Sequence, residues 1–500
     1  ICFINHFTAN TQCVFNNVYG YADEYYDDGA SVIQTNEGGF IAVGNSMKLF
    51  PTYDGVYIIK FDNCGDTIWQ KLYDFSPAGG DVGFSVLQLQ DSSYVICGTT
   101  YDSTEGASDS YLLKLNKFGE IMWYNQIEGG FNDRAYDFKR VIDGGFIIIG
   151  YNYDSTVTSS KISLIKTDSS GNMQWQQLYG NNNVYNFANS VDITNDEGFI
   201  IGGETVDISC SCFKLYLIKT DSLGNLQWQK MYGDADGQKW GYAIQTKDGG
   251  YILSGRKRYA NDNYAGYIIK TDSAGNMKWE KFYDRGPAFD GFKRILQLPD
   301  GNYIAAGNTQ HHDSVTVRNS SGWLLKLDTA GNTLWEKTYT YYGSASTHDY
   351  LEDMSLTNDG GFIFCGYVIN NSLPSKNDLW LVKVDCFGCD GDSVCVDSVP
   401  VNVISEPAIK NKSQITVFPN PFSNETTITI TPLNNNKFHK FNISFYDLSG
   451  KSQNVSHNVN KLKNGIAEIT VHKGNLAPGI YYFKIQSAKI LIGKGKLLIE

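Results

Sequence analysis

The chain has 500 residues, a formal net charge of −12, and 42% hydrophobic against 19% charged residues. This is the composition of a globular protein of two to four domains, and the acidic balance excludes the basic face that a nucleic-acid-binding protein needs. No apolar run reaches the ~18 residues of a membrane-spanning helix, and 50 glycines with 14% aromatic residues favour many short strands joined by tight turns.

The N-terminus and the cysteines both bear on export. Residues 1–10 are mildly apolar and then small, so they fit the remnant of a signal peptide or a simple N-terminal tail, and both alternatives stay open. The ten cysteines favour disulfides in an exported protein. The pair Cys386 and Cys389 has no second such pair and no His-x-His partner, which favours a disulfide over a zinc site.

A repeat occupies residues 11–385. Its first mark is a glycine-aromatic-aliphatic strand whose aromatic residues are 52 to 59 positions apart, by subtraction of their numbers: Phe40, Tyr94, Phe146, Phe199, Tyr251, Tyr303 and Phe362. The next strand ends in a lysine: Lys60, Lys114, Lys166, Lys219, Lys270, Lys326 and Lys383. The third mark is a tryptophan: Trp69, Trp123, Trp175, Trp228, Trp279 and Trp335. With one apolar strand before each aromatic, the pattern predicts blades of four short strands of about five residues.

The N-terminal strand completes the count. Seven lysine strands face only six tryptophan strands, and Phe15 lies 54 positions before Trp69 (69 − 15 = 54), in register with the repeat. We therefore predict an all-β, seven-bladed β-propeller in which the strand around Phe15 closes the last blade. This exchange of strands removes two open sheet edges.

Two turn patterns recur within the repeat. Asp-Gly-Gly, as in Asp143–Gly145, links strands one and two, and Asp-x-x-Gly-Asn, as in Asp168–Asn172, links strands three and four. Glycine supplies the positive φ of a tight turn, and the aspartate caps it. We expect each tryptophan to fill space between blades and each lysine amine to reach a turn aspartate or a carbonyl.

The other connections, from strand two to three and from strand four to the next blade, share the opposite face and are long and variable. Function usually lies on such loops. Candidate ligand-binding residues there are Tyr25, Tyr53, Tyr101, Trp240, Tyr264 and Arg285. Exposed aromatic rings would stack on sugars or anchor a protein partner. The alternative that these rings fold back onto the blades stays open.

No catalytic motif and no metal-ligand set is found in its required context. Residues 234–237 and 390–392 are similar to calcium loops, but neither continues to the glutamate of an EF-hand. A weak, loop-held calcium ion is therefore the one cofactor that the pattern leaves open.

The repeat stops after Asp385. Residues 386–411 have the composition of a cysteine-containing linker, and the alternation of residues 412–500 predicts a small, immunoglobulin-like β-sandwich. Three short motifs stand out in this tail: Val417–Pro421, Leu476–Tyr481 and the lysine-rich final strand.

These motifs, over about the last 85 residues, resemble the type A C-terminal sorting domain of the type IX secretion system of Bacteroidetes. The residues that carry the resemblance are Pro419, Asn420, Pro421, Pro478, Gly479, Tyr481, Lys494 and Gly495. It implies export by the type IX machinery, removal of the domain, and release or attachment at the cell surface. The propeller part resembles repeat propellers found ahead of such domains, which offer no catalytic residues to transfer.

Taken together, the sequence predicts a secreted or surface-attached propeller that binds a polysaccharide or a surface protein without catalysis. Two alternatives stay open. One is an extracellular glycan hydrolase or lyase that uses acidic residues of the loop-rich face. The other is a structural protein of the surface layer.

Overall fold

A computed structural model of the chain describes residues 13–21, 25–48, 55–76, 80–102, 107–127, 133–154, 159–181, 184–207, 212–233, 238–260, 263–285, 289–314, 317–341, 347–370, 376–390, 414–418, 423–431, 442–447, 452–461, 467–487 and 490–499. Every regular element in these residues is a β-strand. The chain divides into two compact parts, Ile1–Val399 and Pro400–Glu500. The predicted signal-peptide remnant at residues 1–10 and most of the predicted linker lie outside the described residues.

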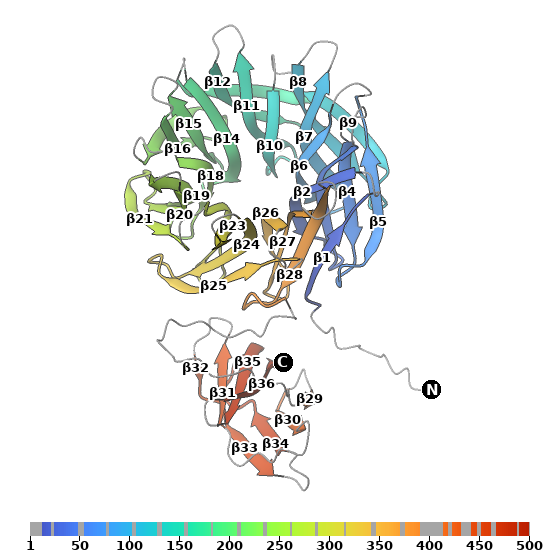
Figure 1. Ribbon diagram of the computed structural model, residues 1–500, viewed down its shortest axis with the longest axis vertical. Helices are drawn as coiled ribbons and strands as arrows, with labels where there is room; N and C mark the ends of the chain where they lie inside the picture. Colours follow the sequence, from blue (N-terminus) through green and yellow to red (C-terminus); the bar gives the residue numbers. More distant parts are fainter. Residues whose placement is uncertain are drawn as a thin grey trace. The chain divides into compact units, whose positions relative to one another are not determined.

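The first part consists of repeated four-stranded antiparallel units arranged around a centre (Figure 1). In chain order its strands are β1 (Phe15–Tyr19), β2 (Tyr25–Gln34), β3 (Phe40–Lys48), β4 (Gly55–Phe61), β5 (Thr67–Tyr73), β6 (Val82–Gln88), β7 (Tyr94–Asp102), β8 (Ala107–Leu115), β9 (Ile121–Ile127), β10 (Asp133–Arg140), β11 (Phe146–Asp154), β12 (Ser159–Thr167), β13 (Met173–Tyr179), β14 (Val184–Ile193), β15 (Phe199–Asp207), β16 (Cys212–Thr220), β17 (Leu226–Tyr232), β18 (Gln238–Gln245), β19 (Tyr251–Ala260), β20 (Asn263–Thr271), β21 (Met277–Tyr283), β22 (Gly291–Gln297), β23 (Tyr303–Ser314), β24 (Val317–Leu327), β25 (Thr333–Tyr339), β26 (Thr347–Leu356), β27 (Phe362–Asn370) and β28 (Lys376–Val384).

We number the repeats in chain order, from β2–β5 as the first to β22–β25 as the sixth, with β26–β28 opening the seventh. The first strand of each repeat lies innermost and the fourth lies at the rim (Figure 1). Many strands are longer than the five residues expected, and β23 reaches 12 residues. Three of the innermost strands have 10 residues, and strands two and three continue their antiparallel pairing into what the sequence alone presents as loops.

The lysine and tryptophan marks of the sequence are cross-strand partners. Lys60 pairs with Trp69, and Lys166 with Trp175, across strands three and four. In the seventh repeat the fourth strand is β1, where Phe15 pairs with Lys383. The predicted exchange of the N-terminal strand is therefore present in the pairing of β1 with β28.

Each lysine of the repeat forms an ion pair with the acidic residue of the turn between strands one and two. The seven N–O distances lie between 2.7 and 3.8 Å. Four of the amines also donate to the carbonyl that follows them, as Lys166 does to Thr167 at 2.8 Å. The structural role predicted for these lysines is confirmed.

The predicted turns are confirmed as well. In the Asp168–Asn172 turn, Oδ1 of Asp168 accepts the N–H groups of Ser170 and Asn172 at 2.8 and 2.9 Å. Gly171, at φ 83°, takes the left-handed position that favours glycine. The same turn forms at Asp385–Cys389, inside the predicted linker, where the N–H of Asp385 donates to Cys389 at 3.0 Å.

Neighbouring repeats meet where a rim aromatic packs on the next turn. The ring of Trp69 lies against Gly119 so closely that a β-carbon there would approach it to 3.1 Å, and Trp175 meets Gly224 in the same way. Phe15 takes this place against Gly65 of the first repeat. The contact between the last and first repeats thus repeats the contact between the others, as the register of Phe15 predicted.

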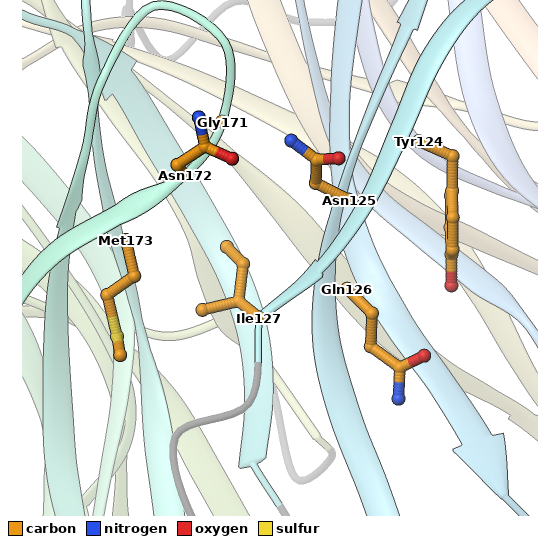
Figure 2. A pocket seen from close by; sticks show the side chains of 7 residues that line it. All are labelled: Tyr124, Asn125, Gln126, Ile127, Gly171, Asn172 and Met173. Atoms are coloured by element: carbon orange, nitrogen blue, oxygen red, sulfur yellow. The ribbon is translucent and has the colours of Figure 1, made fainter.

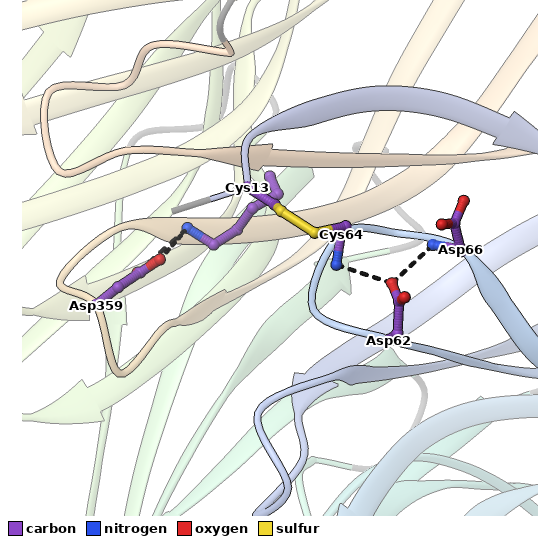
Figure 3. The surroundings of a disulfide bond; sticks show 6 residues. Cys13, Asp62, Cys64, Asp66 and Asp359 are labelled. Atoms are coloured by element: carbon purple, nitrogen blue, oxygen red, sulfur yellow. Dashed lines mark hydrogen bonds and ion pairs between the residues drawn. A yellow bond between two sulfur atoms is a disulfide. The ribbon is translucent and has the colours of Figure 1, made fainter. Parts of the chain in front are cut away.

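A disulfide ties the closing strand to the first repeat. Cys13, two residues before β1, is bonded to Cys64 in the turn between β4 and β5 (Figure 3). In that turn Oδ1 of Asp62 accepts the N–H groups of Cys64 and Asp66 at 2.8 and 2.9 Å (Figure 3). Cys389 is also disulfide-bonded, whereas Cys97 and Cys365 are buried thiols.

The second part contains β29 (Gln414–Phe418), β30 (Glu425–Thr431), β31 (Asn442–Asp447), β32 (Ser452–Gln453), β33 (His457–Lys461), β34 (Ala467–His472), β35 (Gly479–Ser487) and β36 (Ile490–Ile499). They form two four-stranded sheets, in the orders β29-β30-β34-β33 and β32-β31-β35-β36. Residues of both sheets, among them Ile428, Ile469, Phe483 and Leu497, share one buried core.

Candidate functional site

The innermost strands carry polar side chains at one equivalent position of every repeat. Each of these strands has a β-bulge, and the residue that follows it begins the second run of pairing. These residues are Ser31, Ser85, Asp137, Ser190, Tyr242, Arg294 and Asp353. The hydrophobic repeat is therefore interrupted at the centre, where each repeat has its own polar residue.

An ion network joins these positions across the centre. Arg294 forms an ion pair with Asp353 of the next repeat, and its Nη1 lies 3.9 Å from Oδ2 of Asp137, three repeats away. Its guanidinium also lies 4.3 Å from the ring centroid of Tyr242. Lys139 donates to both oxygens of Asp137 at 3.0 Å. Burial alone would lower the pKa of Lys139 and Arg294, but the facing carboxylates outweigh it and raise both pKa values.

Backbone groups of neighbouring repeats complete the network. Oδ2 of Asp353 accepts the N–H of Val32 in the first repeat at 3.1 Å, and Oδ2 of Asp137 accepts that of Val191 at 3.3 Å. Oγ of Ser85 donates to Asp137 at 3.2 Å. Because the buried charges are paired and hydrogen-bonded, the network avoids the large cost of an isolated buried ion.

A second group of side chains lies next to this network, toward the N-terminal ends of the innermost strands. We call it the mouth cluster, and its members are Asp28, Phe84, Tyr136, Tyr151, Phe187, Trp240, Arg256, Tyr264, Lys293 and Glu352. All ten lie at or before the bulge of an inner strand, or on strands two and three beside it.

One half of the mouth cluster is aromatic and comes from repeats two to four. The ring centroids of Phe84 and Tyr136 are 4.8 Å apart, and those of Tyr136 and Tyr151 are 5.9 Å apart. Tyr151 meets Phe187 edge to face at 4.9 Å. All four rings are half-buried. Burial raises the pKa of Tyr136 to about 12, so its hydroxyl stays protonated at neutral pH.

The other part combines aromatic and charged groups from repeats five to seven with Asp28 of the first repeat. The guanidinium of Arg256 lies 3.8 Å from the ring centroid of Trp240 and 4.6 Å from that of Tyr264. The amine of Lys293 lies 4.4 Å from Trp240 and 2.8 Å from Glu352. Cations held over aromatic rings in this way are attracted by the ring quadrupole. Burial lowers the pKa of Arg256 below its ordinary value.

The backbone of Trp240 is held in an unusual conformation. Its φ of 68° is left-handed, and its N–H donates to Oε2 of Glu204 at 3.0 Å. The ring also lies against Gly291, where a β-carbon would approach it to 2.7 Å. Non-glycine residues in this region cost free energy, and they are often found at functional sites.

Two carboxyl groups belong to the charged half. Burial raises the pKa of Asp28 to about 6, against the opposing hydrogen bond from Asn377, and the nearby charge of Glu352 adds to the shift. The Asn377 amide donates to Asp28 at 3.1 Å. A carboxyl group with a pKa raised to about 6, near an ion-paired carboxylate, has the character of the acids that hydrolases use.

Other carboxylates on this side of the ring are structural. Asp27, Asp81, Asp290 and Asp349 occupy the same position, near the start of four inner strands, and all four are buried. One oxygen of each accepts a backbone N–H from the preceding connection, as Asp81 does from Phe75 at 2.6 Å. Burial raises the pKa of Asp349 to about 7.

The structure brings together two of the six residues predicted to bind a ligand, Trp240 and Tyr264. Tyr101 is the residue before the last of β7, with 40% of its surface exposed. Arg285 donates its N–H to Asp290 at 2.8 Å, and its Nε lies 3.8 Å from Glu336. Tyr25 begins β2, and Tyr53 lies outside the described residues.

The sequence reasoning missed several members of the mouth cluster, including Tyr136, Tyr151, Arg256 and Lys293. Tyr136, Tyr151 and Lys293 lie on strands, outside the connections in which the sequence predicts ligand-binding residues. The repeat could have indicated two of them, because Tyr151 and Arg256 each follow the glycine that recurs on strand two, Gly150 and Gly255.

A separate pocket lies at the rim, between the second and third repeats (Figure 2). Its volume is about 380 Å³, and it is lined by Tyr124, Asn125, Gln126, Ile127, Gly171, Asn172 and Met173. Asn125 donates to the carbonyl of Ser170 at 2.6 Å.

No group of three or more possible metal ligands is found among the residues that the structure covers. Residues 234–237 and most of 390–392, the possible calcium loops, lie outside them. The described part of the chain has no helix long and apolar enough to cross a membrane.

Comparison with protein families identifies the C-terminal domain. Residues 416–500 match the family described as the secretion system C-terminal sorting domain. The match identifies a type IX sorting signal. The sorting domain indicates export to the cell surface or the extracellular space and interaction with the type IX secretion machinery.

Within the sorting domain, the second predicted motif forms the entry to β35. Tyr481 is buried, and its hydroxyl donates to the carbonyl of Ala477 at 3.0 Å. Pro478 is exposed, and Gly479 pairs with Ile499 of the final strand. Lys494 and Gly495 lie in β36, opposite Lys484 and Phe483. Pro419, Asn420 and Pro421 lie outside the described residues.

Solved structures similar to the chain include β-propellers. The propeller domain of the trilobed protease from Pyrococcus furiosus has 10% identity and a TM-score of 0.40, covering 74% of this chain and 93% of that one. The Pan2 WD40 domain from Neurospora crassa has 7% identity and a TM-score of 0.40, covering 71% and 89%. An alpha-L-arabinanase from Penicillium chrysogenum, complexed with arabinobiose, has 14% identity and a TM-score of 0.42, covering 59% and 92%. No curated protein matches the chain.

Proposed function

We propose that this exported protein is a closed, seven-bladed β-propeller that binds a polysaccharide at the mouth cluster, without catalysis. The observation that carries the proposal is the continuous set of aromatic rings from Phe84 to Phe187, beside the charged groups around Trp240. Aromatic faces stack on sugar rings, and neighbouring charged and amide groups fix orientation by hydrogen bonds.

Contacts at the junction of the first and last repeats support the closed ring. β1 pairs with β28, Phe15 packs on Gly65, and Asp353 accepts the N–H of Val32. The shared core of its two four-stranded sheets supports an immunoglobulin-like sandwich for the sorting domain.

The binding test uses the full chain on an array of neutral and acidic polysaccharides, with released sugar measured in the same wells. We expect binding without release, and at least tenfold weaker binding by Tyr136→Ala and by Trp240→Ala. The matched control is Phe118→Ala, which removes an aromatic side chain that is 60% exposed in a turn on the opposite side of the ring. Equal binding by all four proteins would refute the assignment to the mouth cluster.

If the folded wild-type chain binds no polysaccharide in any well, the proposal that the ligand is a polysaccharide is refuted. In that case a pull-down of surface proteins, with Trp240→Ala as the comparison, tests the other ligand class. Capture that the variant loses would assign the mouth cluster to a protein ligand.

A second function, glycan hydrolysis, has one observation in its favour. Asp28, with a pKa raised to about 6, and the ion-paired Glu352 have the character of a general acid and its partner carboxylate. If sugar is released, Asp28→Asn should abolish release and leave binding within twofold of wild type. Release that survives in Asp28→Asn rules out this pair.

A further inference from the structure

The second repeat lacks a contact that the other repeats share. In six repeats the last residue of the fourth strand is a tyrosine whose hydroxyl donates to the carbonyl of the turn glycine in the following repeat. The distances are 2.5 to 2.7 Å, for Tyr19, Tyr73, Tyr179, Tyr232, Tyr283 and Tyr339. In the second repeat this position is Ile127. The carbonyl of Gly171 therefore lacks the phenolic donor that its six counterparts have.

The rim pocket lies at this same place. Ile127 and Gly171 both line it, together with the apolar side chain of Met173 (Figure 2). At about 380 Å³ it is larger than the ~150 Å³ cavity that is known to hold benzene in an engineered protein. An isoleucine is shorter than a tyrosine and has no hydroxyl, so the buried side chain of Ile127 cannot donate to the Gly171 carbonyl as the tyrosines of the other repeats donate to theirs.

We propose that this pocket is a binding site for a para-substituted phenol, either a tyrosine side chain or a free phenolic compound. The ring lies against Ile127 and Met173, and the hydroxyl donates to the carbonyl oxygen of Gly171. The para substituent points away from the Gly171 carbonyl toward solvent, because the backbone of Ile127 occupies the place from which the tyrosine rings of the other repeats extend. The amide groups of Asn125, Gln126 and Asn172 form the polar rim that contacts whatever the substituent carries.

This arrangement predicts selectivity for the hydroxyl group. A ligand that donates to a carbonyl is preferred over its isostere without the donor, because the isostere leaves that carbonyl unpaired. p-Cresol should therefore bind at least tenfold more tightly than toluene. N-acetyl-tyrosinamide should bind more tightly than p-cresol if the natural ligand is a protein, and more weakly if it is a free phenolic compound.

The test is ligand-observed NMR on the full chain with these three compounds. Ile127→Tyr supplies the missing phenol from the chain itself and should abolish the binding of p-cresol. Ile127→Phe fills the space without the hydroxyl and should do the same. Thermal melting of each variant shows whether it is folded.

Removing the corresponding tyrosine from another repeat gives an independent check. Tyr179→Ile recreates the arrangement one repeat later, next to Gly224, and should raise the stoichiometry of p-cresol binding from one to two. Binding that persists in Ile127→Tyr, toluene binding as tightly as p-cresol, or an unchanged stoichiometry in folded Tyr179→Ile would each overturn the proposal. Absence of p-cresol binding to the wild-type chain at the solubility limit would overturn it too.

Discussion

The rim and the centre of the repeated part follow opposite rules. At the rim, each repeat places the same kinds of residue in the same contacts, such as a lysine on a turn acid and an aromatic ring on the next glycine. At the centre, the equivalent position is a serine in three repeats, and an aspartate, a tyrosine or an arginine in the others. Residues that recur in every repeat therefore serve packing. Positions at which the repeats differ are the places to look for binding or catalysis.

The same contrast explains the two sites proposed above. The mouth cluster lies at positions where the repeats carry different residues, and the rim pocket lies where one repeat lacks a contact that the others share. In both cases the unusual residue is recognised because the equivalent position in the other repeats can be compared with it.

The centre should be the more fragile of the two regions. Arg294→Ala removes the cation that faces both Asp353 and Asp137 and leaves buried carboxylates without their partner. We expect a loss of ~3–5 kcal/mol in the free energy of unfolding, measured by urea denaturation. Arg140→Ala, an exposed arginine at the end of β10, is the control. Equal losses in the two variants would contradict a central role for the network.

The contact at the junction of the last and first repeats tests whether the rim is uniform. Phe15→Ala removes a buried ring from Gly65, and we expect a loss of about 3 kcal/mol. Trp175→Ala makes the corresponding change between the third and fourth repeats. A much smaller loss for Phe15→Ala, with the disulfide intact in both proteins, would show that the ring depends little on this closing contact.

The buried acids near the start of the inner strands should make stability depend on pH. The folded pKa of Asp349 is about 7, against an ordinary value of 3.8, so the folded state binds the proton more tightly than the unfolded chain does. This contribution is complete below the ordinary pKa and is lost as the pH rises through the folded pKa, several kcal/mol in all. Asp349→Asn should flatten the thermal-stability profile between pH 4 and 7. A profile as steep as that of wild type would assign the slope to other groups.

The smallest effect concerns the turns between strands one and two. Glu197 and Ser92 stand at positive φ, 61° and 63°, where the turns of the other repeats have glycine. Glu197→Gly should therefore relieve backbone strain and stabilise the protein by ~0.5–1 kcal/mol. The control is Asn195→Gly, in the same turn, which is expected to bring no gain. A lower melting temperature for Glu197→Gly would show that its side chain contributes more than its backbone costs.

The periodic features of this protein follow from its sequence. The lysine, tryptophan and glycine positions predicted the four-stranded repeats, the turns and the ion pairs, because each depends on residues that are close in sequence or in equivalent registers. The exchange of the β1 strand could be predicted too, since Phe15 keeps the spacing of the tryptophans. The tail motifs, likewise, are contiguous and read directly as a sorting signal.

The tertiary structure decided what the centre contains and which side chains meet there. Arg294 and Asp137 are 157 positions apart (294 − 137 = 157), and only the arrangement of the repeats around a centre brings their charges to 3.9 Å. Strands two and three also extend past their hydrophobic pattern, because backbone pairing continues where side chains are polar. Trp240 and Tyr264 could thus be singled out as aromatic, but their common contact with Arg256 depends on cross-strand geometry that no local pattern specifies.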